Sequence, residues 1–269
     1  MSKDFEPCDL PDISPDPAAT PPQYMQDIVA EILQRPTRTE REFVSVSPWW
    51  TALNFKINLC AASAPSEVPI TITGPSGTGK EIIARRFAIA GQPFVSLNMA
   101  ALPPQLVTSV LFGHVKGAFT GATENMPGAF LAAGMGTLFL DEIGELPADQ
   151  QAMLLRVLEE RTVTKVGDPK TEYRVACRIV CATNRDIENV KDFREDLAAR
   201  LLMLEFKLLG LLEPERAGDM EAIAERFGLT AGDINEINNH SDLTQRIRMH
   251  NVRALKRFAY RKQYLGEMS

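Results

Sequence analysis

A glycine-rich loop between a strand-like run and a helix-like run is the feature that most limits what this chain can fold into. The loop reads Gly74-Pro75-Ser76-Gly77-Thr78-Gly79-Lys80-Glu81, after the β-rich run 68–73 and before the helical pattern of 80–90. Its spacing is that of a Walker A motif, in which glycines let main-chain N–H groups approach phosphate oxygens and the lysine neutralises phosphate charge. Glu81 stands where a magnesium-binding Ser or Thr is usual. The motif predicts a nucleotide-binding loop, and a glycine-rich turn without a ligand is the alternative while this motif stands alone.

A second motif supplies the acidic side of the same site. The run 136–140 is an apolar strand that ends in Asp141-Glu142. A carboxylate at the end of such a strand can hold magnesium, directly or through water, and we expect this of Asp141. Glu142 can orient and polarise the attacking water. Together with the glycine-rich loop, the pair predicts an ATPase site with ATP and Mg²⁺ as cofactors, against the alternative of a carboxylate pair that only caps the strand.

Strand and helix signals alternate through the middle of the chain. Such alternation favours a parallel sheet with helices on both faces, and the fold class we predict is α/β. The strand-like runs are 68–73, 94–97, 137–140 and 178–182, and the helix-like runs are 80–90 and 150–159, the second preceded by Pro147.

Two other segments mark the limits of this α/β core. The run 163–175 has Gly167-Asp168-Pro169 at its centre and predicts a hairpin. Beyond Pro214 the sequence becomes helical and polar. We therefore predict three parts: a tail with a short helix over 1–42, an ATPase core over 43–212 and a helical lid over 213–269.

The tail differs in composition from the rest of the chain. Residues 1–22 are rich in Pro, Asp and Ser and have few large apolar residues, which predicts disorder. Residues 23–34 show apolar spacing typical of a short amphipathic helix. This helix either docks on a partner or packs on the domain that follows.

Composition restricts the setting and the partners. The formal net charge of −6 disfavours a large phosphate-binding footprint on nucleic acid. The absence of a long apolar run and of an export leader predicts a cytoplasmic protein without a membrane span. The cysteines lack the paired spacing of zinc sites and are expected to be reduced thiols: Cys8, Cys60, Cys177 and Cys181.

A second loop has no nucleotide chemistry of its own. It reads Gly117-Ala118-Phe119-Thr120-Gly121-Ala122. Because nothing in it suits phosphate or metal, we expect something other than ATP to use it. The two loops together indicate a machine that spends ATP on a partner protein.

Over about residues 43–202 the chain resembles the AAA+ domain of bacterial sigma-54-dependent transcriptional activators. This family also has Glu after the Walker A lysine, and the loop GAFTGA at 117–122 is its signature. The likeness continues in Pro93-Phe94-Val95-Ser96-Leu97-Asn98, Leu111-Phe112-Gly113-His114, the run 136–147, the run 154–158, Ala182-Thr183-Asn184-Arg185-Asp186, Phe193-Arg194-Glu195-Asp196-Leu197 and Arg200-Leu201.

The resemblance implies roles for single residues. Asn98 corresponds to a switch residue that hydrogen-bonds the Walker B glutamate, and Thr183 and Asn184 to the sensor I stretch near the γ-phosphate. Arg194 and Arg200 correspond to arginines offered to a neighbouring subunit's nucleotide. The loop 117–122 corresponds to the surface that contacts sigma-54, with Phe119 and Thr120 at its tip.

The chain also departs from the family pattern. Val110 and Val115 replace residues that are usually acidic beside the loop, which puts the usual coupling in doubt. In the run 209–216 one expected arginine is missing and Arg216 is the survivor. The lid is shorter than usual before His250-Asn251-Val252-Arg253-Ala254-Leu255, where Arg253 is the sensor II candidate for nucleotide binding and a surface arginine is the alternative.

Two functions from different classes follow from this resemblance. The first is a motor ATPase that remodels sigma-54 RNA polymerase as a ring, expected to be hexameric, made of one chain or mixed with a DNA-binding activator. The second is a non-motor regulatory subunit that tunes such an activator by joining its ring. Residues 1–42 are too few for the receiver domain that many relatives carry, and the residues after Arg253 are too few for their helix-turn-helix, so we expect neither domain and no direct sequence-specific DNA binding.

Overall fold

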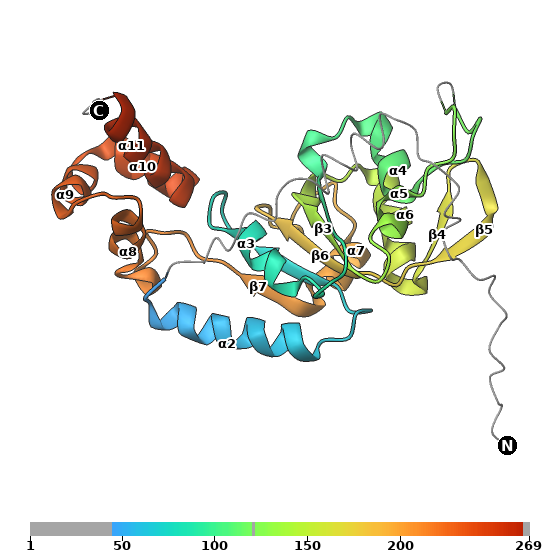
Figure 1. Ribbon diagram of the computed structural model, residues 1–269, viewed down its shortest axis with the longest axis horizontal. Helices are drawn as coiled ribbons and strands as arrows, with labels where there is room; N and C mark the ends of the chain where they lie inside the picture. Colours follow the sequence, from blue (N-terminus) through green and yellow to red (C-terminus); the bar gives the residue numbers. More distant parts are fainter. Residues whose placement is uncertain (1–44, 120–121, 266–269) are drawn as a thin grey trace, which may run out of the picture.

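The computed structural model describes residues 45–119 and 122–265, and a parallel sheet lies at its centre (Figure 1). The predicted tail 1–22 and helix 23–34 lie outside the described residues, as do Thr120 and Gly121. The five strands stand in the order β2-β3-β6-β1-β7 and all pair in parallel. Their bounds are β1 Ile70–Thr73, β2 Phe94–Asn98, β3 Thr137–Asp141, β6 Arg178–Thr183 and β7 Glu205–Lys207.

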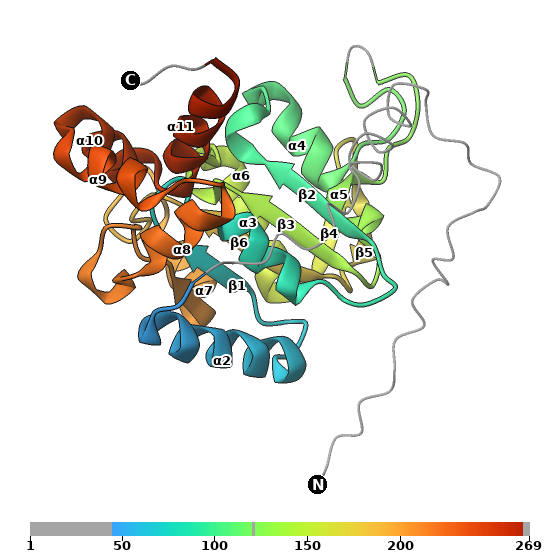
Figure 2. The ribbon, with the colours of Figure 1, turned by 60° about the vertical axis from the view of Figure 1, so that its left-hand side comes forward.

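The side chains of each strand alternate between two separate cores, as the pleat requires. In β3, Leu138 and Leu140 enter one core, which is covered by helices between β2 and β7. Phe139 enters the other core, under α2 and α3. The two views of the ribbon show these helices on opposite faces of the sheet (Figures 1 and 2). The covering helices are α4 Pro104–Phe112, α5 Gly128–Ala132, α6 Ala148–Glu160 and α7 Glu195–Leu201 on one face, and α2 Pro48–Ser63 and α3 Lys80–Ala84 on the other.

The predicted hairpin is confirmed, but its second strand begins earlier than the sequence pattern indicates. Strand β4 covers Thr162–Lys165 and pairs antiparallel with β5, Asp168–Arg174. The pattern places Asp168 in the turn, whereas the structure has it in β5. The pairing shifts register after Thr164, which allows Lys165 to pair with Asp168 across a two-residue turn.

The helix expected over 80–90 is shorter, because the Phe87 carbonyl that a continuing helix would use is already bonded elsewhere. Helix α3 ends at Ala84 and one 3₁₀ turn follows, Arg85–Phe87. The carbonyl of Phe87 accepts hydrogen bonds from the Thr137 hydroxyl at 3.2 Å and from the Arg178 guanidinium at 3.4 Å. Since these donors belong to β3 and β6, tertiary contacts stop the helix where its local pattern would continue.

Helix α2 was not predicted, although its start carries a recognisable signal. The hydroxyl of Ser47 accepts a hydrogen bond from the Trp50 N–H, and Pro48 occupies the first helical turn. Asp219 of the lid accepts hydrogen bonds from the Ser45 hydroxyl and the Ser47 N–H. The start of α2 is therefore joined to a segment 170 residues and more away in sequence.

The chain beyond β7 forms four helices around a third core, as the helical pattern after Pro214 predicts (Figure 2). This core contains Leu211, so the exact boundary at 212 and 213 stays a prediction. None of the helices in the described part of the chain has the length and apolar character needed to cross a membrane. The four helices are α8 Asp219–Arg226, α9 Ala231–Asn239, α10 Ser241–His250 and α11 Val252–Leu265.

Candidate nucleotide site

The carboxyl ends of four parallel strands bring the predicted nucleotide residues to one edge of the sheet. Thr73 at the end of β1 is in register with Thr183 at the end of β6. Asn98 at the end of β2 is in register with Asp141 at the end of β3. In open parallel sheets ligands bind at this edge. The topology therefore supports the nucleotide site that the glycine-rich loop and the carboxylate pair predict.

The glycine-rich loop connects β1 to α3 and bends sharply at its glycines. Gly74, Gly77 and Gly79 have φ angles of 144°, 78° and 102°, which side chains with a Cβ rarely adopt. A Cβ at Gly74 would lie 2.4 Å from the Leu208 carbonyl oxygen. A Cβ at Gly77 would lie 2.1 Å from the His250 carbonyl oxygen. Glycine is therefore required here by close approach of the main chain as well as by backbone angle.

Lys80 is the first residue of α3 and is almost completely buried over the loop. Its ammonium group donates to the main-chain oxygens of Gly74 at 2.9 Å and Pro75 at 3.3 Å. Burial lowers the pKa of Lys80, against the opposing effect of the Glu142 and Asp141 carboxylates. A buried cation that has only carbonyl partners is suited to meet an anion such as a phosphate group.

The remaining loop side chains are arranged in different ways. The Thr78 hydroxyl donates to the Pro75 carbonyl at 2.9 Å and keeps the loop folded on itself. Glu81 is exposed and pairs with Arg85 at 2.9 Å along the helix. Its binding role stays a prediction, because in this arrangement its carboxylate points to a surface partner.

The two carboxylates after β3 are oriented differently by the main chain. Asp141 continues the strand, whereas Glu142 has a φ of 52° and turns away from it. Burial raises the pKa of Asp141, and the adjacent charge of Glu142 raises it further. A bound cation would relieve this repulsion, so the pair fits the predicted Mg²⁺ site. Such a site needs few protein carboxylates when substrate phosphates complete it.

The contact expected of Asn98 is different from the one observed. Its amide nitrogen donates to Asp141 at 3.2 Å and not to Glu142. The reason is the strand register, which places Asn98 beside Asp141, while the left-handed turn carries the Glu142 side chain toward β6. There Glu142 accepts a hydrogen bond from the Asn184 main-chain N–H at 3.3 Å.

The end of β6 lies next to both motifs. The Gly74 N–H donates to the Thr183 carbonyl at 3.2 Å. The Thr183 side chain is buried, and its hydroxyl accepts from the Arg185 N–H at 3.0 Å. The predicted sensor residues Thr183 and Asn184 are therefore brought together with the glycine-rich loop and with Glu142.

The lid contacts the glycine-rich loop through one residue whose role the sequence did not indicate. Asn251 is fully buried, and its amide nitrogen donates to the Ser76 carbonyl at 2.9 Å. Its side-chain oxygen accepts from the Leu211 N–H at 2.6 Å. The predicted lid arginine, Arg253, reaches the Ser76 hydroxyl at 3.5 Å and lies close enough to lower the pKa of Lys80.

Asn251 belongs to the lid motif 250–255. The sequence indicates that this motif resembles the family pattern, but it does not indicate a role for the asparagine itself. Its φ of 49° and ψ of −130° were not readable from the sequence. The positive φ is a backbone conformation that residues other than glycine rarely adopt, and it turns the chain between α10 and α11.

The two predicted intersubunit arginines lie on or next to α7 and bind residues of their own chain. Arg194 is half-exposed and forms a two-point ion pair with Asp196, at 2.7 and 3.0 Å. Its main-chain N–H is fixed by the buried side chain of Gln151 at 2.8 Å. Arg200 donates to the Leu158 carbonyl at 3.4 Å. The reach of either residue into a neighbour stays a prediction.

The second loop is held at its base by the β4–β5 hairpin. In Figure 1 the described residues on both sides of the loop lie beside that hairpin. Val115 donates to the Val166 carbonyl, and Val166 donates to the Gly113 carbonyl, each at 3.0 Å. Gly117 donates to Ala122 at 2.8 Å, which closes the loop.

Phe119 lies at the described edge of this loop and is 42% exposed. Its ring makes an edge contact with His114, with the ring centres 4.9 Å apart. His114 is itself buried and hydrogen-bonded through Nδ1 to the Ser109 hydroxyl at 2.8 Å. The ring of Phe119 is thus available to a partner on one side and supported by His114 on the other.

The cysteines that the structure describes fit the expectation of reduced thiols. Cys177 and Cys181 are buried, and burial raises their pKa to about 11 and about 12. Burial also raises the pKa of Cys60 in α2. In the described residues, no three His, Cys, Asp or Glu side chains gather in a way that could hold a metal ion.

Comparison with known proteins places the chain in a family. The model of the sigma-54 interaction domain matches residues 51–207. The transcriptional regulatory protein FlbD of Caulobacter vibrioides is 40% identical over 254 residues, which is 89% of this chain and 54% of that protein. The DNA-binding transcriptional regulator NtrC of Azospirillum brasilense is 47% identical over 169 residues, which is 60% of this chain and 34% of that protein.

Among solved structures, NtrX from Brucella abortus in complex with ATP superposes with a TM-score of 0.71 at 27% identity, covering 91% of this chain and 57% of that one. The chain thus spans between a third and somewhat over half of the length of these relatives. The family model matches more than half of the residues, and these residues form a parallel sheet with the nucleotide motifs at one edge. The chain therefore belongs to the sigma-54 interaction domain family and has its AAA+ fold.

Proposed function

We propose that this chain hydrolyses ATP as a ring assembly and uses the energy to act on sigma-54 RNA polymerase as a transcription activator. The observation that carries the proposal is the direct hydrogen-bond connection among the ends of three strands. Gly74 of the glycine-rich loop bonds Thr183, and the next residue, Asn184, bonds Glu142. A phosphate-binding loop and a water-polarising carboxylate are thereby held in one frame, as hydrolysis requires.

The residues have distinct roles in this proposal. Lys80 and the main-chain N–H groups of the loop would bind the phosphates, and Asp141 would hold Mg²⁺, which supplies positive charge near the transferring phosphoryl group. Glu142 would orient the attacking water. Arg253 and Asn251 of the lid would position the Ser76 end of the loop, since both bond Ser76.

A continuous segment leads from this site to the second loop. The amide nitrogen of Asn98 bonds Asp141, and its side-chain oxygen accepts from the Ala101 N–H at 3.2 Å. The 3₁₀ turn Met99–Ala101 is followed by α4, which ends at Phe112. Gly113 then begins the segment anchored on Val166. A change in charge at Asp141 would therefore be transmitted along α4 to the loop that carries Phe119.

The ring in this proposal follows from Arg194 and Arg200, which the family resemblance assigns to a neighbour's nucleotide. Arg194 would exchange its exposed pair with Asp196 for the neighbour's phosphate group. Exposed pairs of this kind are screened by water and contribute little to stability, so the exchange costs little. The names of the relatives support transcription regulation, and NtrC is named as DNA-binding. A ring of identical chains and a ring mixed with a DNA-binding relative are both compatible with these residues.

The experiment compares Glu142→Gln with Glu159→Gln. Glu159 is an exposed residue of α6, which makes it a matched control. We expect Glu142→Gln to bind ATP as the unchanged chain does and to hydrolyse it at least about a hundredfold more slowly, a usual loss for a missing general base. Equal hydrolysis by the unchanged chain and Glu142→Gln would reject the role of Glu142. Absence of hydrolysis in the unchanged chain at high concentration would favour the non-motor regulatory subunit.

A further inference from the structure

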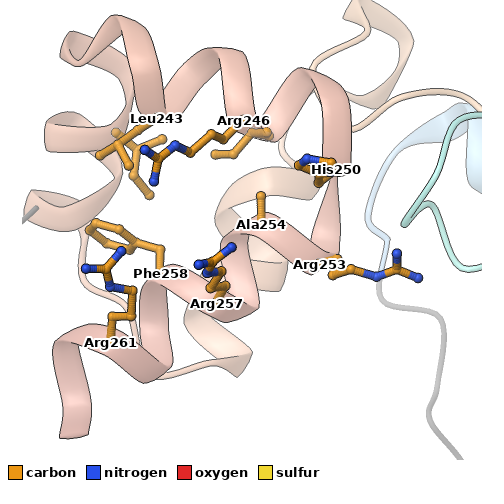
Figure 3. A pocket seen from close by; sticks show the side chains of 10 residues that line it. Leu243, Arg246, His250, Arg253, Ala254, Arg257, Phe258 and Arg261 are labelled. Atoms are coloured by element: carbon orange, nitrogen blue, oxygen red, sulfur yellow. The ribbon is translucent and has the colours of Figure 1, made fainter. Parts of the chain in front are cut away.

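The lid has a cavity with an apolar floor and a basic rim, and of its arginines the proposed ATPase uses only Arg253. It has a volume of about 270 Å³ and lies between α10 and α11. Leu243, Ile247 and Phe258 contribute to its apolar lining, and Arg246, Arg257 and Arg261 to its charged lining. In Figure 3 these three arginines surround the same space, and Arg253, which also lines the cavity, directs its guanidinium to the outside.

The charge of this region is opposite to that of the chain as a whole. Residues 241–265 contain seven Lys and Arg residues and one Asp, a formal charge of +6 in a chain whose total is −6. Helix α11 itself has no acidic residue. A basic rim around an apolar floor suits a ligand that carries both carboxylates and large apolar side chains.

The N-terminal segment of the same chain has this chemistry. Residues 1–22 contain five acidic residues and one lysine, a formal side-chain charge of −4. The large apolar residues Phe5, Leu10 and Ile13 each stand directly beside an acidic residue. An apolar side chain could therefore enter the cavity while its acidic neighbour meets an arginine of the rim.

The described chain begins at the lid. The Ser45 hydroxyl donates to Asp219 at 2.7 Å, and the Val46 N–H donates to the same carboxylate at 2.8 Å. Asp219 is the first residue of α8, and α8 packs against α11. The 22 residues from 23 to 44 can extend to about 75 Å, which is ample for a lid helix next to the attachment point. Tethering also raises the effective concentration of the segment.

We propose that the acidic segment 1–22 binds in the cavity between α10 and α11 of its own chain, with its apolar residues on the floor and its carboxylates on Arg246 and Arg257. Single-stranded nucleic acid fits the site less well, because a sugar-phosphate backbone has no large apolar side chain for the floor. The exposed aromatic residues Tyr260 and Tyr264 lie outside the cavity and contact each other, with ring centres 6.1 Å apart.

Carbodiimide cross-linking of the complete chain tests this proposal without reference to ATP, so its outcome is separate from that of the proposed function. The reagent joins a carboxylate directly to a lysine, and Lys256 of α11 is next to the rim. We expect links from the acidic residues of 1–22 to Lys256, identified by mass spectrometry of peptides. An equal mixture of ¹⁴N- and ¹⁵N-labelled chains should give links within one isotope, which identifies the same chain as the source.

Charge-reversal variants provide the decisive comparison. The double change Arg246→Glu and Arg257→Glu should reduce these links about tenfold, because charge-assisted hydrogen bonds are replaced by repulsion. Arg248→Glu is the matched control, because Arg248 is also exposed on α10 but does not line the cavity. In this variant the links between 1–22 and Lys256 should be unchanged. Phe5→Ala with Leu10→Ala leaves the lid intact and should also reduce the links.

Three results would overturn the proposal. The first is an absence of links between 1–22 and Lys256 in the unchanged chain. The second is links that join ¹⁴N to ¹⁵N chains as often as they join chains of the same isotope, which would assign the cavity to a second copy. The third is undiminished links in the double variant together with loss of its binding to a labelled single-stranded oligonucleotide, which would make the basic surface a nucleic-acid site.

Discussion

The amide of Asn251 donates a hydrogen bond to the main-chain oxygen of Ser76 over 2.9 Å, and this bond joins the lid to the glycine-rich loop. The same side chain accepts from the Leu211 N–H, in the segment that leads from the sheet to the lid. One buried carboxamide therefore fixes the loop, the connecting segment and the turn between α10 and α11 at the same time.

Replacing this carboxamide should weaken nucleotide binding. Asn251→Ala removes both bonds and leaves the Leu211 N–H without its partner, so we expect ATP affinity to fall about three- to tenfold. Titration with a fluorescent ATP analogue measures this. Asn239→Ala, at an exposed position of α9, is the control and should bind as the unchanged chain does. An unchanged affinity in Asn251→Ala would show that the lid contact does not position the loop.

Gly77→Ala tests whether close approach of the lid requires glycine in the loop. Gly77 and Gly91 have similar φ angles, 78° and 73°, but a Cβ at Gly77 meets the His250 oxygen at 2.1 Å while a Cβ at Gly91 meets nothing within 4 Å. Both changes carry the backbone cost of about 1 kcal/mol. Only Gly77→Ala should also displace the lid and abolish ATP binding. Similar ATP binding by the two variants would contradict this explanation.

Asp219 and Arg216 form a fully buried ion pair at 2.7 Å, and this pair should control stability in acid. Burial alone would raise the pKa of Asp219, but hydrogen bonds from Ser45 and Arg216 outweigh it and the net shift is downward. A carboxyl group whose pKa is lower in the folded than in the unfolded chain stabilises the fold above its unfolded pKa of about 4. That contribution is lost as the pH falls below about 4, through the folded pKa.

Asp219→Asn should therefore cost about 3–5 kcal/mol near neutral pH, because it removes the carboxylate of a fully buried ion pair. The difference from the unchanged chain should shrink as the pH falls below about 4. Urea unfolding at several pH values measures both effects. Asp242→Asn, at an exposed position, is the control. A difference in the free energy of unfolding that grows in acid would contradict a lowered pKa of Asp219.

Much of this arrangement could be predicted from the sequence, because it depends on local patterns. The apolar strand before Asp141 and the loop before Lys80 follow from residue types and spacing, and the structure has both where they were expected. The contact of Asn98 could not be predicted in this way, because it depends on strand register and on the positive φ of Glu142. The early end of α3 depends likewise on donors from distant strands.

Phe119→Ala should separate the partner contact from the chemistry. The ring contacts His114 and no residue of the glycine-rich loop, so hydrolysis of ATP should be unchanged. Binding to sigma-54 in the presence of a transition-state analogue should fall at least about tenfold, as for loss of an aromatic anchor. We expect the same of Thr120→Ala. Met135→Ala removes another exposed apolar side chain, 69% exposed, and should leave the complex intact. A stable complex with Phe119→Ala would reject the role of the loop.

The central claim, that the active site is completed by a neighbouring chain, is tested most directly by mixing two inactive variants. Glu142→Gln lacks the water-orienting carboxylate but keeps Arg194. Arg194→Ala keeps the carboxylate of Glu142 and loses only an exposed ion pair within its own chain. Asp196→Asn is the control: it breaks the same ion pair but keeps the arginine, so it should remain active. Alone, Arg194→Ala should hydrolyse ATP roughly a thousandfold more slowly than the unchanged chain, the lower range for such arginines.

In an equal mixture of Glu142→Gln and Arg194→Ala, about a quarter of the interfaces join an intact carboxylate to an intact arginine, and steady-state ATP hydrolysis should recover to about that share of the unchanged rate. The rate should also rise with total protein concentration, since the chains must assemble. A mixture no more active than its two components would contradict the account, because each chain would then complete its own site.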